Sequence, residues 1–210
     1  MPNPARPSTT HLLYLHGFRS SPQSMKAQKV AARVQARHPA VVCWCPQLPP
    51  SPATAIALLE QGVADWPSER MVVVGSSLGG FYARWLGLRL GCRAALLNPA
   101  VHPARDLEAF VGEQTSWHDP DQRFLFEPVF VDQLRAMETE IAEGAASAAT
   151  STESLFAIVA QGDEVLDWQE MVDFCAGGET TVLPGSDHAI SDFDQHIDAL
   201  FNFLALSAST

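Results

Sequence analysis

Short apolar runs alternate with longer amphipathic stretches along most of this chain. The apolar runs, which we predict to be strands, span residues 11–15, 40–45, 71–75, 93–98, 155–161 and 180–184. The stretches with helical character span residues 23–38, 52–65, 78–90 and 193–205. Runs such as MVVVG and LFAIV are apolar throughout rather than alternating, which is typical of strands buried on both faces of a parallel sheet. The pattern predicts an α/β fold with a mostly parallel sheet of about six strands and helices on both faces.

The segment 100–154 breaks this rhythm. It contains short amphipathic pieces and ends in an Ala/Ser/Thr-rich stretch around 142–154. We predict a lid-like insertion of short helices that ends in a mobile linker. A chain of 210 residues can bury one core, so we expect residues 1–210 to form a single domain that carries this small helical insertion.

Composition narrows the classes of partner. The chain has 24 acidic and 13 basic residues, for a net charge of −11. Nucleic-acid binding and docking on anionic membranes both need clustered Lys and Arg, so we expect neither. The N-terminal sequence lacks the apolar core of a signal peptide, and no apolar run is long enough for a membrane span. We therefore expect a cytoplasmic protein.

The four cysteines, at positions 43, 45, 92 and 175, do not suggest a metal site. Cys43 and Cys45 would face the same side of a strand, but no Cys/His pair has zinc-finger spacing. We expect buried free thiols and no metal or organic cofactor.

The clearest chemical motif is Gly75-Ser76-Ser77-Leu78-Gly79, which fits G-x-S-x-G. The pattern alone is weak, but here it follows a β-branched strand and precedes a helix, as in a nucleophile elbow of the α/β-hydrolase fold. Ser77 is the candidate nucleophile because it has a glycine two residues away on both sides, which Ser76 lacks. The alternative is a Gly/Ser-rich turn in which a serine only caps the helix.

A serine nucleophile needs a general base and an acid, which follow it in this fold in the order acid, histidine. Of the seven histidines, only His188 and His196 follow the fifth predicted strand. His188 comes just after the sixth strand and is the candidate base, whereas His196 falls within the final helix. Asp163 is the candidate acid because it is the first acidic residue after the fifth strand.

Other acidic residues near these positions are weaker candidates. Asp167 precedes Trp-Gln-Glu, which is typical of a helix N-cap with Glu170 three residues further on. Asp187 adjoins His188 in the sequence, and neighbours seldom point at each other. Glu164 remains a competitor of Asp163.

The oxyanion hole needs two backbone N–H groups. We expect one from Leu78, after the nucleophile, and one from Phe18, in the loop after the first strand. Gly17 allows the tight turn there, and we assign Gly17 and Phe18 to substrate binding. We expect His16 to be structural. An aromatic group of residues in the insertion either lines an acyl pocket or forms the insertion's own core, and the second is favoured: Trp117, Phe124, Phe126, Phe130 and Leu134.

Together these motifs resemble the YqiA-like esterases, a family of small bacterial α/β-hydrolases. The resemblance rests on LLYLHGFRSSPQSMKA, PQLPP, VGSSLGGFYARWL, LNPAVHP, QGDEVLD and GSDHAI, in that order. It extends from about residue 12 to 204 and implies activity on short acyl esters, and on acyl-CoA thioesters in some cases. It also implies the triad Ser77, Asp163 and His188. The stretch 112–154 looks longer and richer in Ala and Ser than in the family, which affects substrate preference.

We therefore expect a serine carboxylesterase that acts on a small-molecule acyl ester. An acyl-CoA thioesterase would use the same triad but needs cations for the CoA phosphates, for which Arg19, Lys26 and Arg84 are candidates. A catalytically inactive hydrolase fold that serves as a binding protein is the third hypothesis. The sequence does not indicate an oligomeric state.

Overall fold

The central element of the fold is a six-stranded sheet in which every pair of neighbouring strands is parallel. The computed structural model describes residues 7–119, 121–147 and 154–207. The strand order is β2-β1-β3-β4-β7-β8. The strands are β1 (His11–Leu15), β2 (Val42–Trp44), β3 (Met71–Ser76), β4 (Arg93–Leu97), β7 (Leu155–Ala160) and β8 (Glu179–Leu183). This confirms the predicted sheet.

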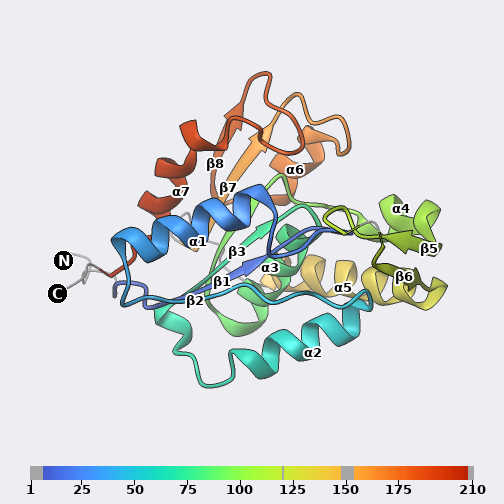
Figure 1. The fold of residues 1–210 in the computed structure, drawn as a ribbon, viewed down its shortest axis with the longest axis horizontal. Helices are drawn as coiled ribbons and strands as arrows, with labels where there is room; N and C mark the ends of the chain where they lie inside the picture. Colours follow the sequence, from blue (N-terminus) through green and yellow to red (C-terminus); the bar gives the residue numbers. More distant parts are fainter. Residues whose placement is uncertain (1–6, 120, 148–153, 208–210) are drawn as a thin grey trace.

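Helices cover both faces of the sheet, as predicted (Figure 1). One face is covered by α1 (Met25–Arg37) and α7 (Ile197–Leu204), the latter preceded by a 3-10 turn, η3 (Phe193–Gln195). The other face is covered by α2 (Pro52–Gly62), α3 (Leu78–Leu90), α5 (Pro128–Ser147) and α6 (Trp168–Phe174). A further 3-10 turn, η1 (Ser68–Arg70), leads into β3.

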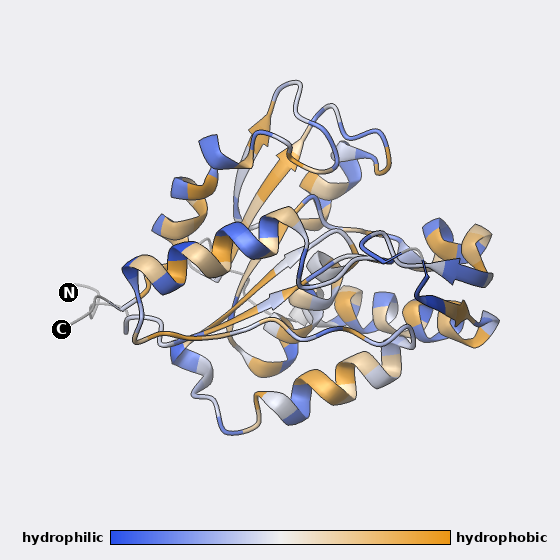
Figure 2. Ribbon diagram, in the orientation of Figure 1, coloured by the Kyte–Doolittle hydropathy of each residue, from blue (hydrophilic) through white to orange (hydrophobic). Residues whose placement is uncertain are grey.

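Alternation along the buried strands sorts side chains between these two layers. Leu13 and Leu15 of β1 join the cluster under α2 and α3, whereas Leu12 and Tyr14 join the cluster under α1 and α7. Burial on both faces explains why β7 is apolar throughout, and Figure 2 shows β7 in the hydrophobic colour, whereas the edge strand β8 (ETTVL) is partly polar and less buried.

The insertion contains more than the predicted short helices. It consists of α4 (Pro103–Leu107), a 3-10 turn η2 (Glu108–Phe110), an antiparallel hairpin of β5 (Gly112–Thr115) and β6 (Arg123–Phe126), and the 20-residue helix α5. The hairpin strands GEQT and RFLF are short and partly polar, so they leave no continuous apolar run to predict them. The linker predicted around 142–154 is wrong as far as Ser147, where α5 ends, and residues 148–153 lie outside the described part.

The insertion packs onto the main core. Phe126, Phe130 and Leu134 are buried in the same cluster as α2 and α3, so they belong to the main core rather than to a separate core of the insertion. Trp117 and Phe124 are not: Trp117 is exposed and Phe124 only partly buried. The hairpin therefore presents some aromatic side chains to the core and others to the outside.

Two further sequence-based expectations can be compared with the structure. Cys92 and Cys175 are buried, but Cys43 on the edge strand β2 is exposed and Cys45 is only partly buried, so the prediction of four buried thiols is wrong for Cys43 and holds only in part for Cys45. Among the described residues, no helix has both the length and the apolar character that a membrane crossing requires.

Candidate active site

Ser77 occupies a sharp turn between β3 and α3. β3 ends at Ser76 and α3 begins at Leu78, and Ser77 between them has φ 56° and ψ −123°. A positive φ is strained for a non-glycine residue and is found mostly where the surroundings impose it. The glycines on either side of Ser77 make this sharp turn possible, because a side chain at either position would clash with nearby backbone. A Cβ on Gly75 would lie 2.0 Å from the Gly79 carbonyl oxygen, and a Cβ on Gly79 would lie 2.1 Å from that of Leu15.

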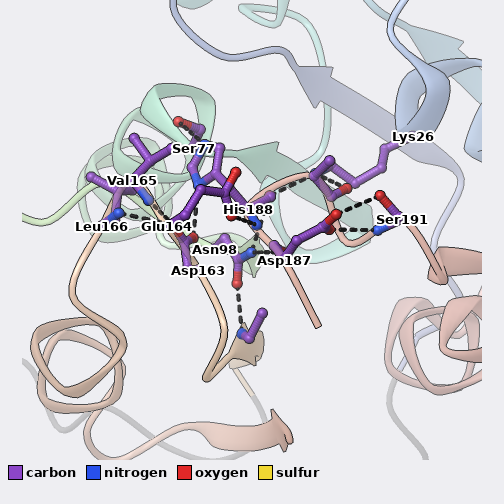
Figure 3. A network of polar contacts seen from close by, with 12 residues as sticks. Lys26, Ser77, Asn98, Asp163, Glu164, Val165, Leu166, Asp187, His188 and Ser191 are labelled. Atoms are coloured by element: carbon purple, nitrogen blue, oxygen red, sulfur yellow. Dashed lines mark hydrogen bonds and ion pairs between the residues drawn. The ribbon is translucent and has the colours of Figure 1, made fainter. Parts of the chain in front are cut away.

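Three side chains meet at the carboxyl ends of the strands. The Ser77 Oγ lies 3.2 Å from Nε2 of His188, whose Nδ1 lies 2.7 Å from Oδ2 of Asp163 (Figure 3). Asp163 follows β7 and His188 follows β8, so the parallel sheet brings both to the edge where Ser77 lies. The Asp163 side chain is fully buried, whereas that of His188 is 22% exposed. The structure thus brings together the three residues singled out from the sequence.

The orientation of the Asp163 carboxylate is fixed by the backbone that follows it. Its Oδ1 accepts hydrogen bonds from the N–H groups of Val165 and Leu166, both at 2.8 Å. Oδ2 is therefore left to face His188. The carboxylate holds the imidazole with Nδ1 as the donor, which leaves Nε2 free to accept a proton from Ser77.

The backbone of His188 is itself held by side chains from three other parts of the chain. Its N–H donates to Glu164 Oε2 at 3.0 Å. Its carbonyl oxygen accepts from Asn98 Nδ2 at 3.1 Å and lies 3.5 Å from Lys26 Nζ (Figure 3). These contacts hold the backbone of His188 at both its N–H and its carbonyl oxygen. The direction of the imidazole is therefore fixed by neighbouring segments as well as by the loop that carries it.

The sequence reasoning missed Asn98, and it named Lys26 only as a candidate cation for CoA phosphates. Asn98 is fully buried at a positive φ of 43°, and its Oδ1 also accepts the Ala160 N–H at 2.8 Å. It thereby connects the end of β7 to the His188 loop. A polar residue at the carboxyl end of a buried strand was the one available signal for Asn98.

Lys26 is buried beside the same loop. Its ammonium group donates to the Ala189 carbonyl at 2.7 Å. Burial lowers the pKa of Lys26 to about 8, although the nearby charges of Asp187 and Asp163 oppose this. The periodicity of α1 gave no reason to separate this lysine from the solvent-exposed ones on the same helix.

The weaker acidic candidates lie in other arrangements. Asp187 accepts hydrogen bonds from the N–H and the hydroxyl of Ser191, which lower its pKa. Asp167 caps α6 by accepting the Gln169 N–H at 2.8 Å, which confirms the N-cap prediction. Glu164 contacts the His188 backbone rather than its ring.

The remaining histidine candidates also have partners away from Ser77. His196 precedes α7 and bonds Asp192 at 2.9 Å. The Nε2 of His16 accepts the Leu48 N–H at 3.0 Å, and its Nδ1 lies 3.0 Å from the Gly17 carbonyl oxygen. Because Nε2 accepts this hydrogen bond it carries no proton, so the ring is neutral and connects the loops after β1 and β2; burial also lowers the pKa of His16.

The loop after β1 lies directly against Ser77. A Cβ on Gly17 would lie 3.1 Å from the Ser77 Cβ, so glycine permits the close approach. Within the described residues, the N–H groups of Phe18 and Leu78 have no backbone or side-chain acceptor. Both residues line the cavity next to Ser77, so these donors are available to a bound group.

Two cavities meet at Gly17 and Phe18. The larger cavity encloses about 470 Å³, and its apolar wall is made by Phe18, Leu48, Pro49, Pro50, Leu58 and Phe124. The smaller cavity encloses about 280 Å³ and includes Ser77 and His188 in its wall. The hairpin segment contributes to both, with Phe124 in the larger cavity and Trp117 in the smaller one.

Arg19 joins the insertion to the loop after β1. Its Nε donates to the Thr115 carbonyl oxygen at 2.7 Å, its guanidinium lies 4.2 Å from the centre of the Trp117 ring, and the Trp117 N–H donates back to the Arg19 carbonyl at 2.7 Å. Phe18 packs edge-on against Phe124 in the same hairpin. The hairpin therefore supports the loop that carries the Phe18 N–H.

Three cations were candidates for binding CoA phosphates. Arg84 and Lys26 are both buried, and Arg19 is engaged by Thr115 and Trp117. None of the three is displayed on the surface as an open phosphate site.

As a whole, the arrangement can perform nucleophilic acyl transfer. A hydroxyl in a strained turn contacts an imidazole, the imidazole contacts a buried carboxylate, and two unpaired N–H groups lie next to the hydroxyl. These are the parts needed to activate the hydroxyl and to stabilise an oxyanion.

A family model and several solved structures resemble this chain. A family model described as "Uncharacterised protein family (UPF0227)" matches residues 11–205. Est1E from Butyrivibrio proteoclasticus, solved with ferulic acid bound, has a TM-score of 0.69 and 14% identity over 97% of this chain and 91% of that one. A monoacylglycerol lipase from Paleococcus ferrophilus has a TM-score of 0.71 and 10% identity over 94% of this chain and 95% of that one. At these identities the likeness shows a shared α/β-hydrolase fold.

Proposed function

Because this chain belongs to the uncharacterised protein family UPF0227, the YqiA-like family, and has the α/β-hydrolase fold, we propose that it is a serine esterase of short-chain acyl esters. The observation that carries this proposal is the contact of Ser77 Oγ with His188 Nε2 at 3.2 Å, with Asp163 on the other ring nitrogen at 2.7 Å. A structural neighbour described as a monoacylglycerol lipase supports ester substrates.

In the proposed reaction, Ser77 Oγ attacks the ester carbonyl carbon while His188 Nε2 takes the hydroxyl proton. The tetrahedral oxyanion accepts hydrogen bonds from the N–H groups of Phe18 and Leu78. His188 then donates its proton to the leaving alcohol, and an acyl-enzyme remains on Ser77. His188 next activates a water molecule, which releases the acid and restores the serine. Asp163 stabilises the imidazolium in both halves, and the reaction uses no cofactor.

The insertion over residues 100–154 acts as a lid in this proposal. Its hairpin places Phe124 at the larger cavity and Trp117 at the smaller one, and Arg19 ties it to the loop after β1. A cover of this kind excludes water from the oxyanion and strengthens the hydrogen bonds made to it.

The test is hydrolysis of p-nitrophenyl butyrate by the parent protein and by Ser77→Ala. We expect kcat to fall by roughly 10³-fold or more in the variant, as when a nucleophile is lost. Ser68→Ala is the matched control, because Ser68 lies in η1 before β3, at the opposite end of that strand from Ser77. Equal activity in the parent and in Ser77→Ala would refute the proposal.

Two further measurements separate the alternative functions. Labelling by a fluorophosphonate probe that depends on Ser77 is expected for an active serine hydrolase and absent from an inactive binding protein. Rates on butyryl-CoA and on a matched butyrate oxygen ester compare thioesterase with esterase activity. We expect the oxygen ester to be preferred, since Arg19, Lys26 and Arg84 are engaged or buried.

A further inference from the structure

The Phe18 N–H, one of the two donors proposed for the oxyanion, lies in a tight turn after β1. The Ser20 N–H donates to the Gly17 carbonyl oxygen at 3.2 Å, which closes a four-residue turn over residues 17–20 with Phe18 as its second residue. The Phe18 N–H takes no part in that bond. The direction in which it points therefore depends on how this turn is held.

The residue types in this turn do not favour its conformation. Arg19, the third residue, has a φ of 59°. A positive φ at the third position of a β-turn favours glycine or asparagine, because other side chains are crowded there by the backbone. An arginine keeps such a conformation only where the surrounding structure imposes it. The turn must therefore be stabilised by contacts with other segments.

The hairpin of the insertion supplies these contacts through Arg19. The Arg19 Nε donates to the Thr115 carbonyl oxygen at 2.7 Å, and its Nη2 donates to the Thr115 Oγ1 at 3.0 Å. The guanidinium also lies over the Trp117 ring, 4.2 Å from its centre, and the Trp117 N–H donates to the Arg19 carbonyl oxygen at 2.7 Å. Both the side chain and the backbone of Arg19 are thus bound by a segment 96 residues further along the chain.

The neighbouring Phe18 contacts the same insertion. Its ring packs edge-on against the rings of Phe110, Phe124 and Phe126, whose centroids lie 5.7, 6.0 and 5.1 Å away. On its other side the turn meets the nucleophile, since a Cβ on Gly17 would lie 3.1 Å from the Ser77 Cβ. The turn therefore lies between the insertion and Ser77, and the insertion determines where its two central residues sit.

Building on the proposed esterase function, we infer that Arg19 is a positioning residue for the oxyanion hole and that the insertion is a working part of that hole. Arg19 holds the turn in the conformation that directs the Phe18 N–H at the oxyanion formed on Ser77. It acts through Phe18 and not by contact with the reacting atoms. Hydrogen bonds to the oxyanion are stronger in the transition state than in the ground state, so loss of this support should lower kcat rather than raise KM.

The first test is Arg19→Ala with p-nitrophenyl butyrate as the substrate. We expect kcat to fall by about tenfold to a hundredfold, which is less than or equal to the loss of a whole oxyanion donor, with KM within about threefold of the parent value. Arg123→Ala is the matched control, because Arg123 forms an exposed ion pair with Glu113 at 2.6 Å within the same hairpin. Such a pair contributes little, so kcat should stay within about twofold. A parent-like kcat in Arg19→Ala, or an equal loss in Arg123→Ala, would overturn the inference.

A tetrahedral ligand separates the positioning of the oxyanion hole from a general loss of structure. Propylboronic acid has the shape of the butyryl group: Ser77 Oγ adds to boron, the serine proton passes to His188, and one boron-bound oxygen takes the place of the oxyanion. Its inhibition constant should rise in Arg19→Ala by about the factor by which kcat falls, while the thermal unfolding midpoint stays within about 4 °C. A lower kcat with unchanged affinity for the boronic acid would contradict the inference.

Thr115→Val is a second variant, which leaves Arg19 in place. It removes the hydroxyl acceptor of the guanidinium and keeps the backbone carbonyl. Alone it should lower kcat by about threefold to tenfold, as for the loss of one hydrogen bond. In an Arg19→Ala background it should change kcat by less than about twofold, because its partner is already absent. No loss in the single variant, or an equal loss in both backgrounds, would show that Thr115 does not act through Arg19 and would refute the inference.

These outcomes also separate the inference from the function on which it rests. If hydrolysis depends on Ser77 but Arg19→Ala keeps the parent kcat and the parent affinity for the boronic acid, only the role of Arg19 is wrong. If Ser77→Ala is as active as the parent and no fluorophosphonate labelling depends on Ser77, both the esterase function and the role of Arg19 are wrong.

Discussion

Replacing Asp163 with asparagine should invert the hydrogen-bonding polarity of the His188 ring. In the native protein Oδ1 accepts two backbone N–H groups, from Val165 and Leu166. The amide of the introduced asparagine would keep its oxygen there, because its NH₂ group would otherwise face two donors. The NH₂ group would then point at His188 Nδ1, which must become an acceptor. The ring proton would move to Nε2, where it blocks acceptance of the Ser77 proton.

The expected loss follows from this change of tautomer. Holding a catalytic histidine in the wrong tautomer lowers kcat by about 10⁴-fold, which corresponds to about 5.4 kcal/mol in the activation free energy. The fold should survive, because the amide oxygen retains both backbone hydrogen bonds. We would measure kcat on p-nitrophenyl butyrate and the thermal unfolding midpoint of the same preparations.

Asp167→Asn is the matched control for this substitution. Asp167 is the N-cap of α6 and accepts the Gln169 N–H. Asparagine is as good an N-cap as aspartate, so this variant should keep both its stability and its kcat within about twofold. If Asp163→Asn is folded and retains more than a tenth of the parent kcat, Asp163 does not set the tautomer of His188, and the reasoning fails.

Three other predictions concern the surroundings of the site. Glu164→Ala removes the acceptor of the His188 N–H and should lower kcat by about tenfold at unchanged KM. Glu164→Gln keeps an acceptor, so its kcat should stay within about threefold of the parent value. Equal losses of kcat in the two variants would show that this hydrogen bond does not position the ring. Gly79→Ala places a Cβ 2.1 Å from the Leu15 carbonyl oxygen and should lower the unfolding midpoint by about 8 °C or more, so an unchanged midpoint in calorimetry would contradict the close approach. His16 has its pKa lowered in the folded state, mainly by burial, so the unfolded chain binds the extra proton first as the pH falls below about 6.5. The free energy of unfolding should therefore decrease from pH 7 to pH 5, and denaturant titrations should show a smaller decrease for His16→Gln; identical pH dependence would argue against a buried neutral ring.

Local sequence determined the sheet and the turn at Ser77. Strands buried on both faces must be apolar at every position, so β3 and β7 are visible as uninterrupted runs. Gly75 is required by a backbone contact with Gly79 in the same short segment, whereas Gly79 is required by its close approach to Leu15 at the end of β1. The expected proximity of Ser77, Asp163 and His188 followed from chain order, since parallel strands present their carboxyl ends at one edge.

Tertiary structure decided the features that depend on contacts between distant segments. The hairpin of β5 and β6 is stabilised by pairing and by packing on the core, and its half-polar strands carry no periodic signal. Nothing near Phe124 or Phe126 in the sequence says that the first lines a cavity and the second enters the core.

The hydrogen bonds that hold the His188 backbone are the clearest example of a feature decided by the tertiary structure. Lys26, Asn98 and Glu164 come from α1, the end of β4 and the loop after β7, and all three contact the backbone of His188. Hydrogen bonds between residues so far apart in the chain leave no pattern in the sequence on either side of them. The residue types and chain order therefore indicated which groups could do chemistry, whereas the folded packing determined how those groups are aimed and held.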